Sequence, residues 1–223
     1  GLSTLFIVGA GSAILGLAVP VYEHQFQLST ATSGLLVSTV RIGCLTGVLT
    51  MYFKGAQIKP RPPLALLAIG SVLLAVAPAF WVALLGALTF GIGYGVIAAL
   101  FNARVLYAYG AQGASRIGML NVLYSVGAIV APYGFTLMGA SLLPVFWAMA
   151  GLSALTWVFC GPVGLAGLSA PQAHGRGFKL HWPILVLGLL SVGIEASLVG
   201  LGPSALNRAG LSAQRAAELL SLF

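Results

Sequence analysis

Charged residues are scarce in this chain. Only 6% of its 223 residues are charged and 59% are hydrophobic, whereas roughly a quarter of the residues in ordinary soluble domains are charged. There are three acidic residues, Glu23, Glu195 and Glu218, and aspartate is absent. A soluble surface cannot be built from so little charge, so the composition excludes an ordinary water-soluble domain and predicts an all-α membrane protein.

Other residue patterns are missing as well. Cys44 and Cys160 both lie in apolar runs, and His174 and His181 have no acidic or cysteine partner at metal-ligand spacing, so we predict neither a metal site nor a cofactor. The ten Lys and Arg residues are scattered between apolar runs and form no patch, which argues against nucleic-acid binding. The chain has no Ser, His and acid constellation, and we do not expect an enzyme.

The apolar runs can be counted as membrane helices, because a helix needs about 20 residues to cross the hydrocarbon layer and satisfies its own backbone groups. The uncharged stretches 62–103 and 117–175 are each long enough for two crossings, which turn near Pro78 and at Ser141 to Pro144. The sequence thus predicts seven spans and the start of an eighth. The spans with predicted bounds are Leu5–Val21, Ser33–Phe53 and Trp182–Ala205, and the unfinished eighth is Ser212–Phe223.

The cations predict an orientation, because cytoplasmic loops carry an excess of Lys and Arg. An inner amino terminus leaves only Arg208 and Arg215 outside. The inner side then takes Lys54, Lys59, Arg61, Arg104, Arg116, Arg176 and Lys179. The polar stretch 169–181 becomes a cytoplasmic linker, and Glu23 and His24 form an outer turn.

An internal repeat is present at an offset of 183 residues, the separation of Pro20 and Pro203. The other matched positions are Leu28 with Leu211, Ser29 with Ser212, Leu36 with Leu219 and Ser38 with Ser221. Transporter halves are often related copies, so we predict three parts. They are a six-helix bundle (1–168), the linker (169–181) and the incomplete start of a second bundle (182–223).

Several short sequence motifs make the prediction more specific. They are Gly91-Ile92-Gly93-Tyr94-Gly95 followed by Asn102, Leu120-Asn121 followed by Gly127 and Pro132, and Gly193-Ile194-Glu195. Together with the helix order, they resemble the fucose-permease-like branch of the major facilitator superfamily. The resemblance implies a major-facilitator-type six-helix bundle plus the first helix of a second one, in a bacterial inner membrane. It also implies a symporter or antiporter that moves a small polar solute, sugar-like or an organic anion, by alternating access.

The chain departs from that family at two places. The segment Phe53–Arg61 has no acidic residue where the superfamily usually carries a Gly, Asp, Arg, Gly signature, and Gly16 and Ala98 stand near the positions of membrane carboxylates in sugar/proton symporters. These departures favour an alternative, in which a transporter-like fold serves as a structural or assembly subunit beside other membrane subunits.

Two charges are predicted deep within spans, where ionisable residues are costly and mark function by default. Arg41 is expected to bind an anionic or polar group of the solute or to hold a gate, or else to tether backbone carbonyls. Glu195 is expected to be a proton or cation site, or a neutral carboxyl bonded to a neighbouring helix. Asn102 and Asn121 fit a solute contact and an interhelical hydrogen bond equally well.

Small residues inside the spans are interpreted as packing or gating positions. Glycines at these spacings let helices approach closely, and no strand precedes them as a nucleotide-binding fingerprint would require. The positions are Gly43, Gly47, Gly93, Gly127 and Pro132.

Overall fold

A computed structural model describes residues 2–54, 58–160 and 182–220, and these residues form helices joined by short turns, with no strand among them. The predicted all-α class is therefore confirmed. The α-helices in chain order are α1 (Leu2–Phe26), α2 (Thr30–Lys54), α3 (Arg61–Val76), α4 (Phe80–Tyr109), α5 (Gly113–Leu137), α6 (Leu142–Phe159), α7 (Trp182–Arg208) and α8 (Ala213–Leu220). A short 3-10 turn, η2 (Gly110–Gln112), joins α4 to α5.

The helices match the apolar runs but extend beyond them. The turns near Pro78 and Ser141 lie where the sequence predicted them. The outer turn was misplaced, since Glu23 and His24 belong to α1, which continues through Pro20 to Phe26. Arg104 and Arg116 likewise lie within α4 and α5, where no nearby proline interrupts the helix.

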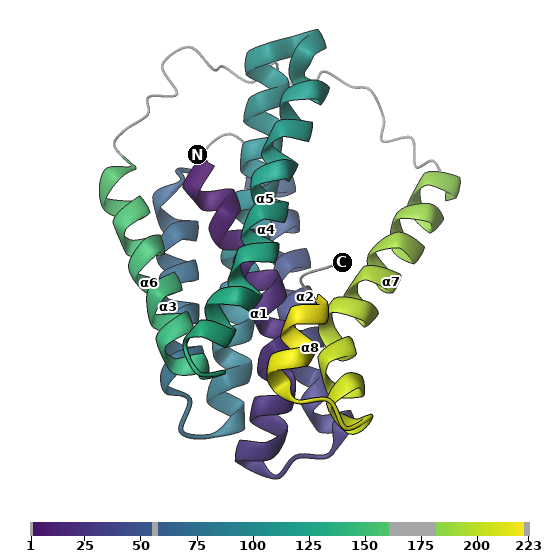
Figure 1. The fold of residues 1–223 in the computed structure, drawn as a ribbon. Helices are drawn as coiled ribbons and strands as arrows, with labels where there is room; N and C mark the ends of the chain where they lie inside the picture. The colour runs from purple at the N-terminus through teal and green to yellow at the C-terminus, as the bar shows by residue number, and fades with distance from the viewer. Residues whose placement is uncertain (1, 55–57, 161–181, 221–223) are drawn as a thin grey trace.

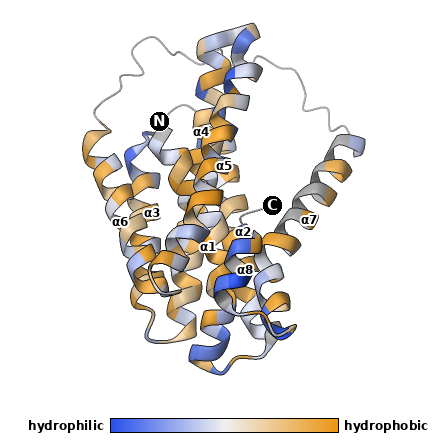
Figure 2. Cartoon of the chain, in the orientation of Figure 1, coloured by the Kyte–Doolittle hydropathy of each residue, from blue (hydrophilic) through white to orange (hydrophobic). Residues whose placement is uncertain are grey.

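Four stretches of the described residues are long and apolar enough to cross a membrane, namely Ser3–Phe26, Ala31–Lys54, Phe80–Leu137 and Leu142–Phe159. The third contains both α4 and α5, and α3 is a shorter apolar helix of 16 residues. Figure 2 shows apolar residues along the middle of the helices and polar residues at their ends. The described residues are therefore helical, and the length and composition of these four stretches indicate an integral membrane protein. The predicted linker, 169–181, lies outside the described residues.

Helix α1 lies at the centre of the bundle and is almost wholly buried (Figure 1). It packs against α5 on one side and α7 on another, while α4 packs between α2 and α3, and α6 covers α3. Large side chains such as Phe90, Phe135 and Phe146 are completely buried in this core.

Glycines set the close approach of α2 to α4. A Cβ atom added at Gly43 would lie 2.5 Å from the carbonyl oxygen of Leu88. Additions at Gly47, Gly91 and Gly95 would also collide with the backbone of the facing helix. Small residues on both helices are therefore required for this contact.

The other predicted packing positions lie at different contacts. A Cβ at Gly93 would meet the carbonyl oxygen of Pro63 in α3 at 2.7 Å, and one at Gly127 would collide with the backbone of Phe6 in α1. Pro132 is buried within α5. The structure thus places these three positions in contacts of α4 with α3 and of α5 with its neighbours.

The turn between α7 and α8 repeats the turn between α1 and α2. The amide of Leu28 donates to the carbonyl of Glu23 at 3.0 Å, and 183 residues later Leu211 donates to Leu206 at 3.1 Å. The residue before each donor has positive φ, 52° at Gln27 and 91° at Gly210. Both helices therefore end in the same left-handed turn.

The helices that follow these turns also begin alike. Ser29 Oγ accepts from the amide of Thr32 at 3.3 Å, and Ser212 Oγ accepts from the amide of Arg215 at 3.3 Å. The offset found in the sequence therefore relates two helix–turn–helix units that share backbone geometry and serine capping.

Candidate functional site

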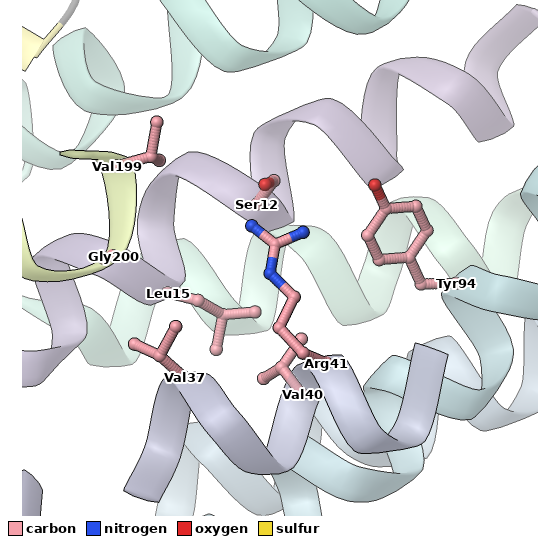
Figure 3. Close-up of a pocket in the computed structure, with 9 residues that line it drawn as sticks. Ser12, Leu15, Val37, Val40, Arg41, Tyr94, Val199 and Gly200 are labelled. Atoms are coloured by element: carbon pink, nitrogen blue, oxygen red, sulfur yellow. The ribbon is translucent and has the colours of Figure 1, made fainter. Parts of the chain in front are cut away.

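Arg41 lies in the middle of α2, and its side chain extends between α1 and α4 (Figure 3). The guanidinium lies between Ser12 of α1 and Tyr94 of α4, with α7 close by. Four helices thus contribute to one small pocket. Its lining residues are Ser12, Leu15, Gly16, Val37, Val40, Arg41, Tyr94, Val199 and Gly200.

The pocket is narrow and mostly apolar. Its volume is about 20 Å³, enough for about one water molecule. Arg41 and Tyr94 are both half-buried. The polar groups beside Arg41 are therefore hydroxyls held among apolar walls.

A larger groove continues from the same arginine. It has a volume of about 370 Å³ between α2 and α7. Its serine hydroxyls bond back to their own helices, Ser38 to the carbonyl of Gly34 at 3.2 Å and Ser197 to that of Gly193 at 2.8 Å. The lining residues are Gly34, Val37, Ser38, Arg41, Ser197 and Leu201. Arg41 is shared by the pocket and the groove.

The α1–α7 contact at this pocket joins equivalent positions of the repeat. A Cβ added at Gly16 would collide with the carbonyl oxygen of Val199, the residue 183 positions later. On the α2 side, a Cβ at Gly200 would lie 2.8 Å from Cγ1 of Val37. Helix α2 contacts α7, and α8 contacts α1 in the corresponding way. A contact between equivalent positions is the signature of a two-fold relationship.

The other predicted site residues are not assembled around Arg41. Glu195 lies in α7, about one turn before Val199, but its side chain is outside the described part of the structure. Asn102 and Asn121 are exposed and line neither the pocket nor the groove. They lie two turns from η2, on α4 and α5 respectively.

An ion pair that sequence reasoning missed joins the two units at the other end of the groove. Glu23 Oε1 lies 3.0 Å from Arg208 Nη2 and also accepts a hydrogen bond from Ser33 Oγ at 2.7 Å. The carboxylate thereby links α1 to both α2 and α7. Its partners lie 10 and 185 residues away along the chain, so no local pattern pointed to them.

Ser12, Val199 and Gly200 were also missed as pocket residues. Ser12 is the one of these that carried a signal, because it is a hydroxyl in an otherwise apolar run. Among the described residues, no group of three or more His, Cys, Asp or Glu side chains could hold a metal ion.

Comparison with known proteins gives no independent assignment. No protein-family model, curated protein or solved structure matches this chain.

Proposed function

We propose that this chain forms the first six-helix bundle, and the start of the second, of a major-facilitator-type secondary transporter that moves a small polar solute by alternating access. The observation that carries the proposal is the crossing of α1 and α7 at Gly16 and Val199, with Arg41 beside it. Secondary transporters bind their solutes at the interface of such repeats, near the middle of the membrane. A charge at that depth is expected to have a function.

The helix arrangement supports an alternating pathway. At the end that carries Glu23 and Arg208, α1 and α7 are joined by an ion pair. Toward its amino-terminal end, α7 diverges from α2 and α4 (Figure 1). One end of the α1–α7 interface is therefore held together while the other is spread, as in one of the two states of a rocking transporter.

The distribution of cations supports an orientation for this state. Lys54, Arg61, Arg104 and Arg116 lie at the end where α7 diverges, opposite the Glu23–Arg208 pair. By the positive-inside rule that end is cytoplasmic, as is the amino terminus. The state described is then closed to the outside.

Uptake into proteoliposomes tests the proposal. We expect saturable flux of a small polar solute, and loss of that flux in Arg41→Gln and in Glu195→Gln. Matched controls are Arg116→Gln and Glu218→Gln, which remove like charges away from the crossing. Unchanged flux in both test variants would contradict the assignment of Arg41 and Glu195 to solute transport. No flux, together with copurification in a complex of fixed stoichiometry, would identify a structural subunit instead.

A further inference from the structure

The charge of Arg41 has no described counter-ion. None of the described residues that line the pocket or the groove is acidic, and the side chain of Glu195 on the adjoining α7 lies outside them. Glu23 pairs with Arg208, and Glu218 is exposed on α8. An arginine in the middle of a membrane is costly unless it is paired or hydrated. An anion in the groove would place a counter-charge beside Arg41.

The hydrogen-bond donors at the site are concentrated on Arg41. Ser38 and Ser197 donate to carbonyls of their own helices, so they leave no hydroxyl proton for a ligand. The guanidinium has five N–H donors in a planar fork, which matches two coplanar oxygens of a carboxylate. Ser12 and Tyr94 place two more hydroxyls beside it (Figure 3).

The space beside the arginine suits a small ligand. The groove of about 370 Å³ lies at the lower end of the range for small-molecule sites, about 300 to 1,000 Å³. A cation would meet the positive charge of Arg41 in apolar surroundings, where charge repulsion is poorly screened.

From these observations we infer that the solute is a small organic carboxylate, and that Arg41 binds its two oxygens. The inference rests on the proposed transport function and specifies the substrate class. Binding and transport are separate measurements, so the two claims can fail separately.

Thermal unfolding of the purified protein in detergent tests the binding claim, because a ligand of the folded state raises the unfolding temperature. The probes are benzoate and lactate, each compared with its neutral amide, benzamide and lactamide. We expect stabilisation by the carboxylates and none by the amides. In Arg41→Gln the carboxylates should bind roughly 10- to 100-fold more weakly, the usual effect of removing a hydrogen bond to a charged group.

Two further variants make the result specific. Arg41→Lys keeps the charge but loses the fork, so it should bind carboxylates with an intermediate affinity. Arg116→Gln removes one cation elsewhere and should bind as the parent protein does. Equal stabilisation by acid and amide, or carboxylate binding that survives Arg41→Gln, would overturn the inference.

Glu195 provides a further check. If Arg41 serves only as an ion-pair partner of Glu195, the single variant Arg41→Gln loses carboxylate binding because Glu195 is left unpaired. The double variant Arg41→Gln with Glu195→Gln should then bind carboxylates again. That recovery would also overturn the inference. Flux of neutral sugars without carboxylate binding would support the transporter proposal and contradict a carboxylate substrate. Carboxylate binding without any flux would support a carboxylate ligand and contradict the transporter proposal.

Discussion

Gly16 of α1 lies directly against the backbone carbonyl of Val199 of α7, its own counterpart 183 residues later. The two helices therefore meet at the one point where a two-fold axis would pass between them. Arg41, from the next helix, reaches the same point. The geometry of the site and the repeat of the sequence thus coincide.

Gly16→Val tests the need for a small residue at this crossing. The added side chain would collide with the Val199 backbone, so α7 must move away from α1. We expect flux in proteoliposomes to fall at least as far as in Arg41→Gln. Gly118→Ala is the matched control, because a Cβ at Gly118 meets nothing within 4 Å. Full flux in Gly16→Val would show that the crossing does not matter.

Adding a side chain at the α2–α4 contact should lower the stability of the protein. Gly47→Val would drive a branched side chain into the backbone around Ile92. Overpacking of this kind costs about 1 to 3 kcal/mol. The unfolding temperature in detergent should decrease clearly in Gly47→Val, while Gly134→Ala, whose added Cβ meets nothing within 4 Å, should show no decrease. Equal unfolding temperatures for the two variants would contradict the packing.

Tyr22 stabilises the short helix α3. Its hydroxyl donates to the carbonyl of Leu74, a buried contact 52 residues away in sequence. Leu74 is in the last turn of α3, where carbonyls lack a partner within the helix. Tyr22→Phe leaves that carbonyl unsatisfied and should cost about 1 to 3 kcal/mol. Tyr52→Phe, at an exposed position, should leave the unfolding temperature unchanged, and a similar loss in both variants would argue against this bond.

In the proposed transporter, the Glu23–Arg208 pair holds the proposed outer end closed. Arg208 is 53% exposed and Glu23 17% exposed, so solvent screens the pair on one side only. Because glutamine can still accept the hydrogen bond from Ser33, we expect Glu23→Gln to weaken the closed state rather than unfold the protein. The measurement uses a protein with a cysteine at Ser38 and with Cys44 and Cys160 replaced. An impermeant maleimide added from the proposed outer side should label this cysteine faster in Glu23→Gln than in the protein with Glu23 intact. Glu218→Gln is the control. Unchanged labelling in Glu23→Gln would mean that the pair is not a latch.

The sequence predicted the helices better than the site. Long apolar runs and the breaks near Pro78 and Ser141 defined most helices, because membrane helices depend on local composition. It placed Arg104 and Arg116 at the limits of apolar runs but not inside α4 and α5, because a charged residue marks where an apolar run ends and not where a helix ends. It did not place Ser12 beside Arg41 or Arg208 beside Glu23, because such pairings depend on how distant helices cross. Asn102 and Asn121 were singled out by polarity, which does not report the face that a side chain occupies.

The most direct test of alternating access is a pair of spin-label distances in lipid nanodiscs. One pair joins Gln25 of α1 to Ala209 after α7, at the end with the ion pair; the other joins Phe53 of α2 to Trp182 of α7, at the opposite end. All four positions are exposed. We expect two distance populations for each pair. In one state the first pair is close and the second is far apart, and in the other state the first is far apart and the second is close. Added solute should change the proportions of the two states. A single unchanging distance for both pairs would contradict alternating access.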